Sequence, residues 1–192
     1  MAAMIAKRHR SLAALLFVAP FLTHCAQEPA RVVEPRQGSA PAERGEAVLR
    51  AAMLAGHNRA RAAVGLPPLV WNEALASSAR IYAETMARTG RFEHARQSMG
   101  MDREGENLWT GTRNAYRYDE MAAHWVAEKR DFVNLPVPQF SRTGRWQDVA
   151  HYGQIVSRNT TDVGCALASD AQDDFLVCRY SPPGNVYGRP VY

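Results

Sequence analysis

The chain has 192 residues, 46% of them hydrophobic and 22% charged, so it is long enough for one globular domain with a substantial core. The formal net charge is +4, and the first 25 residues contribute three basic side chains, Lys7, Arg8 and Arg10, and no acidic one. The rest of the chain is therefore nearly neutral. This balance gives no electrostatic reason to expect binding to nucleic acid or to an anionic membrane surface.

The first 25 residues are typical of an export signal. A basic stretch at 7–10 precedes an apolar run at 11–22, which is too short to cross a bilayer comfortably. We therefore predict a signal peptide over 1–25 and expect a secreted, periplasmic or cell-envelope protein. Cys25 ends the sequence LTHC, which is similar to a bacterial lipobox, although the residue before that cysteine is normally small. Lipid modification of Cys25 and simple signal cleavage both remain open.

A linker and two helices are expected next. Residues 26–45 are rich in Pro, Ala, Glu and Arg and predict a flexible linker in front of a domain at 46–192. Apolar residues at intervals of three and four predict a first helix over 46–64. Asn72 is a suitable N-cap for a second helix, and Gly90 ends it.

The middle of the chain predicts a loop followed by a third helix. Residues 91–114 contain several glycines and show no clear period, which indicates a loop. The third helix is expected over 118–131. Glu128 falls on the apolar face that Met121 and Trp125 define, where a glutamate is costly unless it is paired.

The C-terminal part changes from helical to strand patterns. Three short strands are predicted, at 151–157, 162–168 and 174–180. Folding the last two about residues 171–172 places Cys165 opposite Cys178, close enough for a disulfide in an oxidising compartment. Helices that come first and an antiparallel sheet that comes late predict an α+β fold.

Two of the four histidines after the signal have simple structural interpretations. His57 lies close to the apolar face of the first helix, which indicates a packing role. His124 precedes Glu128 by four residues, which predicts a contact along the third helix.

Four other residues could carry chemistry, and they are His94, Glu106, Glu128 and His151. Two histidines and two carboxylates can form a zinc site with room for water, or a hydrogen-bonded network that joins layers of the fold. Spacing alone leaves both interpretations open, because no H-E-x-x-H motif is present. The chain also lacks a G-x-S-x-G elbow and a P-loop, and its cysteines are better used outside catalysis.

Five segments resemble a known family and occur in its order. They are HNRARAAVGLPPLVWNEALASSARIYA (57–83), GENLW (105–109), HWVAEKRDF (124–132), HYGQIVSRNTTDVGCA (151–166) and VCRYSPPGNVYG (177–188). Together they resemble the CAP superfamily, also called SCP/TAPS, which includes plant pathogenesis-related protein 1 and the cysteine-rich secretory proteins. The resemblance covers residues 46–188.

The resemblance implies a three-layer α-β-α sandwich with a central antiparallel sheet and a cleft that holds a His/Glu tetrad. The tetrad residues carried over by motif are His94, Glu106, Glu128 and His151, and the family's paired cysteines match Cys165 and Cys178. The chain departs from the family at Gly153, where a threonine is usual, and at Ser157, where a tryptophan is frequent. It also lacks the cysteine-rich extension of the animal members, so their ion-channel activity is not expected.

We expect a non-enzymatic binding module for a lipid, sterol-like, envelope or host ligand. In this interpretation the tetrad binds Zn²⁺ or another divalent cation, or only stabilises the fold. The alternative is a zinc-dependent hydrolase or protease, in which Glu106 or Glu128 acts as general base on a metal-bound water. No nucleic-acid partner is expected, and membrane contact is expected only through the signal peptide or a lipid anchor at Cys25.

Overall fold

The computed structural model describes residues 42–97, 100 and 102–192. The predicted signal peptide, Cys25 and most of the predicted linker lie outside the described residues. Within the described part of the chain, no helix combines the length and the apolar character needed to cross a bilayer. The last predicted linker residues are part of the domain, because the Arg44 guanidinium lies 2.8 Å from the buried Asp174 carboxylate and 5.2 Å from the Tyr118 ring.

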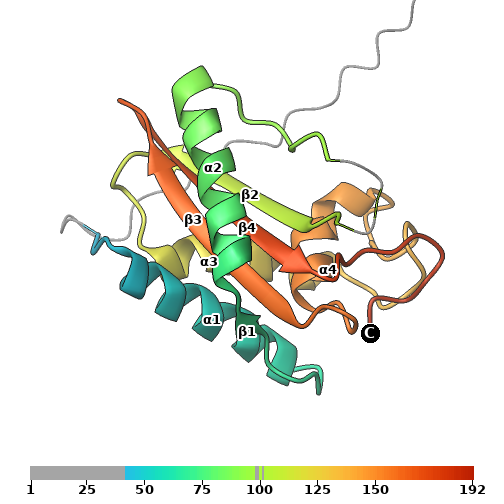
Figure 1. The fold of residues 1–192 in the computed structure, drawn as a ribbon. Coiled ribbons are helices and arrows are strands. Elements are labelled where there is room, and N and C mark those ends of the chain that lie inside the picture. The colour runs from blue at the N-terminus through green and yellow to red at the C-terminus, as the bar shows by residue number, and fades with distance from the viewer. Residues whose placement is uncertain (1–41, 98–99, 101) are drawn as a thin grey trace, which may run out of the picture.

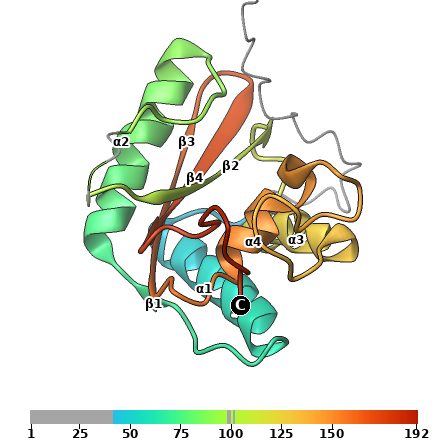
Figure 2. The same ribbon diagram turned by 90° about the vertical axis from the view of Figure 1, so that its right-hand side faces the viewer.

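The described residues form an α-β-α sandwich, as the family resemblance implied. Helix α2 (Glu73–Thr89) covers one face of the sheet, and α1 (Glu46–Ala62), α3 (Tyr118–Ala127) and α4 (Ala150–Ile155) cover the other (Figures 1 and 2). The larger apolar core lies between the sheet and this group of three helices, and a smaller core lies under α2. The α+β fold class is confirmed.

The central sheet has four strands in the order β1-β3-β4-β2. The strands β2 (Gly105–Thr112), β3 (Asp162–Ser169) and β4 (Asp173–Ser181) pair antiparallel, as the family resemblance implied, and the two-residue strand β1 (Val70–Trp71) adds to β3 in parallel. The β3–β4 hairpin has the predicted register. Cys165 lies opposite Cys178, and the two form a disulfide.

The first two helices follow their sequence signals closely. In α2 the side chain of Asn72 accepts hydrogen bonds from the backbone N–H groups of Ala74 and Leu75, so it is the N-cap that the sequence predicts. Gly90 ends the same helix in the left-handed conformation, with φ of 67°, which glycine adopts without strain. The α1 helix ends two residues earlier than predicted.

The prediction of a loop over 91–114 was wrong for its second half, because β2 occupies part of it. All eight residues of β2 pair with β4. Its two glycines make room for large neighbours, and these glycines gave the appearance of a loop. A Cβ on Gly105 would lie 2.3 Å from the Gln154 side chain, and one on Gly111 would lie 2.6 Å from the Trp109 ring.

The prediction of a strand at 151–157 was also wrong, since Ala150–Ile155 form helix α4. Val149, Tyr152 and Val156 are all buried, and their spacing of three and four is helical. Gly153 also favours a close helical contact, because a side chain at this position would meet Phe140 and Asn185. The third predicted helix ends early, at Ala127, and a 3-10 turn, η1 (Glu128–Asp131), continues it.

Candidate functional site

The first pair of tetrad residues is His94 and Glu106. Glu106 lies on β2 with a side chain that is only 5% exposed, and the Nδ1 atom of His94 is 2.6 Å from its Oε1 atom. The backbone N–H of Ala95 donates to the same oxygen at 3.0 Å. The segment after α2 is thereby fixed to β2, and the ring of His94 is held through Nδ1.

A buried arginine supports this pair from the neighbouring strand. Arg179 lies directly across from Glu106 in the β2–β4 register, and its Nη2 atom is 2.8 Å from Oε2 of Glu106. Its guanidinium also lies 5.3 Å from the centre of the Tyr82 ring. Burial raises the pKa of Tyr82 to about 12, with smaller contributions from the charges of Glu106 and Glu93. The role of Arg179 was not assigned from the sequence, because it depends on the position of β2, which the sequence did not indicate.

The second pair is Glu128 and His151. The Nδ1 atom of His151 is 2.6 Å from Oε1 of Glu128, and the backbone N–H of Tyr152 donates to Oε2 at 3.0 Å. The ring of Trp125 stacks on His151, with the ring centres 6.0 Å apart. Glu128 therefore interrupts the apolar face of the third helix because it pairs with His151 at the start of α4.

The two pairs are joined through β2. Asn107 follows Glu106 in this strand, and its Nδ2 atom donates to the backbone carbonyl of His151 at 3.1 Å. Each histidine is held through Nδ1, so Nε2 is the ring atom left for a metal ion. Among residues 42–97, 100 and 102–192, no three or more His, Cys, Asp or Glu side chains form a group that could hold a metal. The four-residue metal site therefore stays a prediction.

His57 has the packing role that the sequence predicts. Its Nδ1 donates to the backbone carbonyl of Met53 at 2.7 Å, and its Nε2 accepts from the hydroxyl of Tyr180 at 2.8 Å. Burial lowers the pKa of His57 from 6.5 to about 4, so the ring is neutral at ordinary pH. His124 accepts a hydrogen bond at 2.9 Å from the indole N–H of Trp109.

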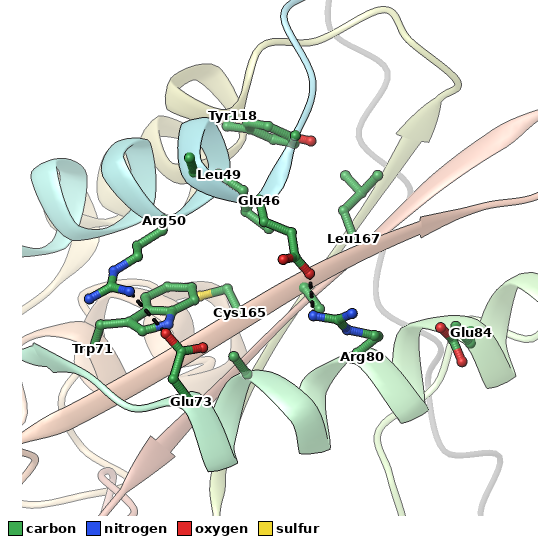
Figure 3. A pocket seen from close by; sticks show the side chains of 14 residues that line it. Glu46, Leu49, Arg50, Trp71, Glu73, Arg80, Glu84, Tyr118, Cys165 and Leu167 are labelled. Atoms are coloured by element: carbon green, nitrogen blue, oxygen red, sulfur yellow. Dashed lines mark hydrogen bonds and ion pairs between the residues drawn. The ribbon is translucent and has the colours of Figure 1, made fainter.

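Two cavities lie outside the tetrad. The α1–α3 groove has a volume of about 220 Å³ and lies between helices α1 and α3, lined by Gly56, Arg59, Ala60, Ala63, Asp119, Ala123, Val126 and Lys129. The α1–α2 groove has a volume of about 570 Å³ and lies between α1 and α2 beside β3 (Figure 3). Neither is lined by a tetrad residue.

Comparison with known proteins gives consistent results. The model of the CAP family, described as the cysteine-rich secretory protein family, matches residues 54–180. A pathogenesis-related PR-1 type protein of Sambucus nigra is 36% identical over 137 residues, which cover 71% of this chain and 77% of that protein. Venom allergen 3 of Solenopsis invicta is 34% identical over 140 residues, 68% of this chain and 58% of the allergen. The crystal structure of NaASP2 with Zn²⁺ superposes with a TM-score of 0.62 at 21% identity, covering 77% of this chain and 86% of that one.

Proposed function

The chain belongs to the CAP, or cysteine-rich secretory protein, family, and from this premise we propose that it is a secreted, non-enzymatic protein that binds an amphiphile with a single acyl chain. The disulfide between Cys165 and Cys178 agrees with export to an oxidising compartment. Lipidation of Cys25, which would add a membrane anchor, remains a prediction.

The α1–α3 groove is the observation that carries this proposal. Its wall consists mainly of small apolar residues, so the two helices leave a narrow space between them. These residues are Gly56, Ala60, Ala63, Ala123 and Val126. A slender acyl chain fits such a space better than a rigid, wide sterol ring system. Burying the chain is favourable, at about 0.8 kcal/mol for each methylene group removed from water.

The polar residues at the groove favour an anionic head group. Arg59 of α1 and Lys129 of η1 line it together with a single acid, Asp119. Two cations and one anion leave a net positive charge, which attracts a carboxylate or a phosphate. An ionised fatty acid therefore satisfies both the apolar wall and the charged rim.

We expect the tetrad to bind a divalent cation as an additional ligand. His94 and His151 would hold it through Nε2, while Glu106 and Glu128 orient the rings through Nδ1, the usual arrangement of a carboxylate behind a metal-binding histidine. A bound cation would supply a positive charge for an anionic group of a ligand. The NaASP2 structure, determined with Zn²⁺, is a precedent on the same fold.

The hydrolase alternative gains no comparable support. Both candidate general bases, Glu106 and Glu128, already accept a histidine Nδ1 contact and a backbone N–H hydrogen bond. A carboxylate held in this way is suited to fixing an imidazole ring, and it is poorly placed to take a proton from water.

A titration with cis-parinaric acid, a fluorescent fatty acid, tests the proposal. We expect saturable binding to residues 26–192, which Ala123→Leu weakens at least about tenfold by filling the groove. Ala127→Leu is the matched control, since Ala127 is exposed on the same helix and outside the groove. Lys129→Gln should weaken the fatty acid and leave the corresponding fatty alcohol unaffected.

A zinc titration tests the cation site separately from the acyl-chain site. Calorimetric binding of about one zinc per chain, lost in a folded His94→Ala/His151→Ala double variant, would support the cation site. Equal fatty-acid affinity in the wild type, Ala123→Leu and Ala127→Leu would contradict the acyl-chain site, whatever the zinc result.

A further inference from the structure

One edge of the central sheet is open beyond its first two residues. Strand β1 pairs with β3 only at Val70 and Trp71, because Asn72 then caps α2 and the chain leaves the sheet. Among the described residues, no strand pairs with β3 on this side between Gly164 and Ser169. Unpaired strand edges are templates for the addition of another strand.

The direction of the main-chain groups at this edge follows from the register. The backbone N–H of Asn72 donates to the carbonyl of Val163 at 2.9 Å, so the main chain of Val163 faces β1. The Cα atoms of Cys165 and Cys178 are 4.1 Å apart, which is the close spacing of a non-hydrogen-bonded antiparallel pair. The N–H and C=O groups of Cys165 therefore also point away from β4, and by alternation so do those of Leu167.

The middle of this edge, Cys165 to Leu167, forms the floor of the α1–α2 groove. Figure 3 shows α1 on one side of β3 and α2 on the other, with the strand running between them. The wall residues include Leu49 and Tyr118 on the side of α1, and Ala76 and Arg80 of α2. The cavity is thus a channel along a strand edge, with Leu49 and Tyr118 deep in the wall on the side of α1 and charged side chains at the mouth of both walls.

Two ion pairs cross the mouth of the groove from helix to helix (Figure 3). Arg50 of α1 lies 2.9 Å from Glu73 of α2, and Glu46 of α1 pairs with Arg80 of α2. All four side chains are more than half exposed, from 51% to 77%. Exposed pairs of this kind contribute only about 0–1 kcal/mol each, so they open at little cost.

Trp71, the last residue of β1, provides a second observation at this edge. Its indole Nε1 atom is buried and has no hydrogen-bond partner among the described residues. The guanidinium of Arg50 lies over the ring at 5.6 Å from its centre, which holds the ring in place. A buried donor of this kind is normally satisfied, and Trp71 lines the α1–α2 groove, so a ligand with hydrogen-bond acceptors suits this end of it.

We propose that the α1–α2 groove binds an extended peptide segment of a partner protein, which adds to β3 as a strand. The open edge from Gly164 to Ser169 is about 20 Å long at the usual rise per residue, enough for five or six peptide residues. Side chains of the peptide would alternate between Leu49 and Tyr118 on one face and Arg80 on the other.

The groove selects a single strand over a second copy of this chain. Strands pair at about 4.8 Å, and an edge recessed between α1 and α2 cannot come that close to the same recessed edge of another copy. A free, extended segment has no such flanking helices. Main-chain hydrogen bonds would supply the affinity, and the two walls would supply the selectivity.

The capped peptide Ac-TVEVKV-NH2 tests the proposal with the chain that follows the predicted signal peptide, residues 26–192. It has no net charge, valines for Leu49 and Tyr118, and a glutamate that can face Arg80. We expect a Kd on the order of 100 µM. The peptide residues form two alternating sets, and the backbone N–H groups of only one set face β3. Methylating the backbone nitrogens of that set should abolish binding, whereas methylating those of the other set should leave binding unchanged.

Amide exchange locates the bound peptide. Binding should slow exchange of the Leu167 N–H, which faces the open edge, and leave Ala166 and Ala168 unchanged, because they already pair with β4. Glu46→Gln/Glu73→Gln removes both ion pairs and should tighten binding about threefold to tenfold. Asp131→Asn, which breaks the Arg130–Asp131 pair elsewhere, is the matched control and should have no effect.

Three results would overturn the proposal. The first is peptide binding that persists when either set of backbone nitrogens is methylated. The second is protection of amides in residues away from β3. The third is the absence of peptide binding at about 1 mM to both the wild type and the ion-pair variant. The predicted fatty-acid binding is independent of all three, since the α1–α3 groove shares no lining residue with this one.

Discussion

At the scale of single residues, three of the histidines have distinct environments, one buried in the core and two held at the tetrad. His57 is fully buried between Met53 and Tyr180, whereas the side chains of His94 and His151 are 55% and 22% exposed. The periodicity of the first helix predicted the packing role of His57. Spacing alone could not pair His94 with Glu106, and only the family resemblance grouped the tetrad.

Acid should destabilise the protein through His57. Burial lowers its pKa from 6.5 to about 4, the hydrogen bond to the Met53 carbonyl partly opposes this lowering, and the charge of Arg61 adds a smaller lowering. Below pH 6.5 the unfolded chain takes up a proton that the folded chain refuses, so the free energy of unfolding falls as the pH drops from 6.5 to 4. The loss reaches about 3 kcal/mol.

Urea unfolding at both ends of this pH window measures the effect. His57→Gln removes the titrating group, and the variant should lose less stability than the wild type between the same two pH values. Parallel pH profiles for the two proteins would show that His57 does not carry the acid sensitivity.

At the scale of elements, the sequence predicted what short-range signals encode. Asn72 and Gly90 mark the ends of α2, and the turn between Cys165 and Cys178 sets the register of the hairpin. Strand β2 was missed because its glycines are required by distant side chains, such as Gln154 against Gly105. Helix α4 was missed because a six-residue segment fits a helical and a strand pattern almost equally well.

The contact between α2 and β3 depends on the absence of a side chain at Gly164. A Cβ there would lie 2.2 Å from the backbone nitrogen of Ala76 and 2.5 Å from the carbonyl oxygen of Asn72. Backbone atoms at the start of a helix cannot move aside cheaply, so we expect Gly164→Ala to lower the free energy of unfolding by at least about 2 kcal/mol.

Urea denaturation checks this value, with Gly56→Ala as the control. A Cβ at Gly56 meets only the Cβ of Ala122, at 3.1 Å, and alanine favours the helix, so this variant should stay within about 1 kcal/mol of the wild type. Equal stability of the two variants would mean that α2 can shift on the sheet.

At the scale of the whole molecule, a buried arginine joins the first helix of the domain to the segment that follows α4. Arg61, near the C-terminus of α1, is 1% exposed and donates to the carbonyl of Pro67. It also donates to three carbonyls in the segment that ends α4 and leads to β3, those of Ile155, Ser157 and Thr160. Each contact is to a neutral carbonyl, so the charge is compensated by dipoles, and the planar guanidinium holds segments that are about a hundred residues apart.

Lysine cannot replace this arrangement, although it keeps the charge. An ammonium group has no planar fork, so Arg61→Lys would leave some of the four carbonyls without a donor, at a cost of about 1–3 kcal/mol for each buried group left unsatisfied. We expect a loss of about 3 kcal/mol or more in the free energy of unfolding, measured by urea denaturation. Arg59→Lys, an exposed change two residues away, should alter it by less than about 0.5 kcal/mol. If both variants were equally stable, the link between α1 and the segment after α4 would rest on apolar packing, because the remaining contacts between them are those of the core.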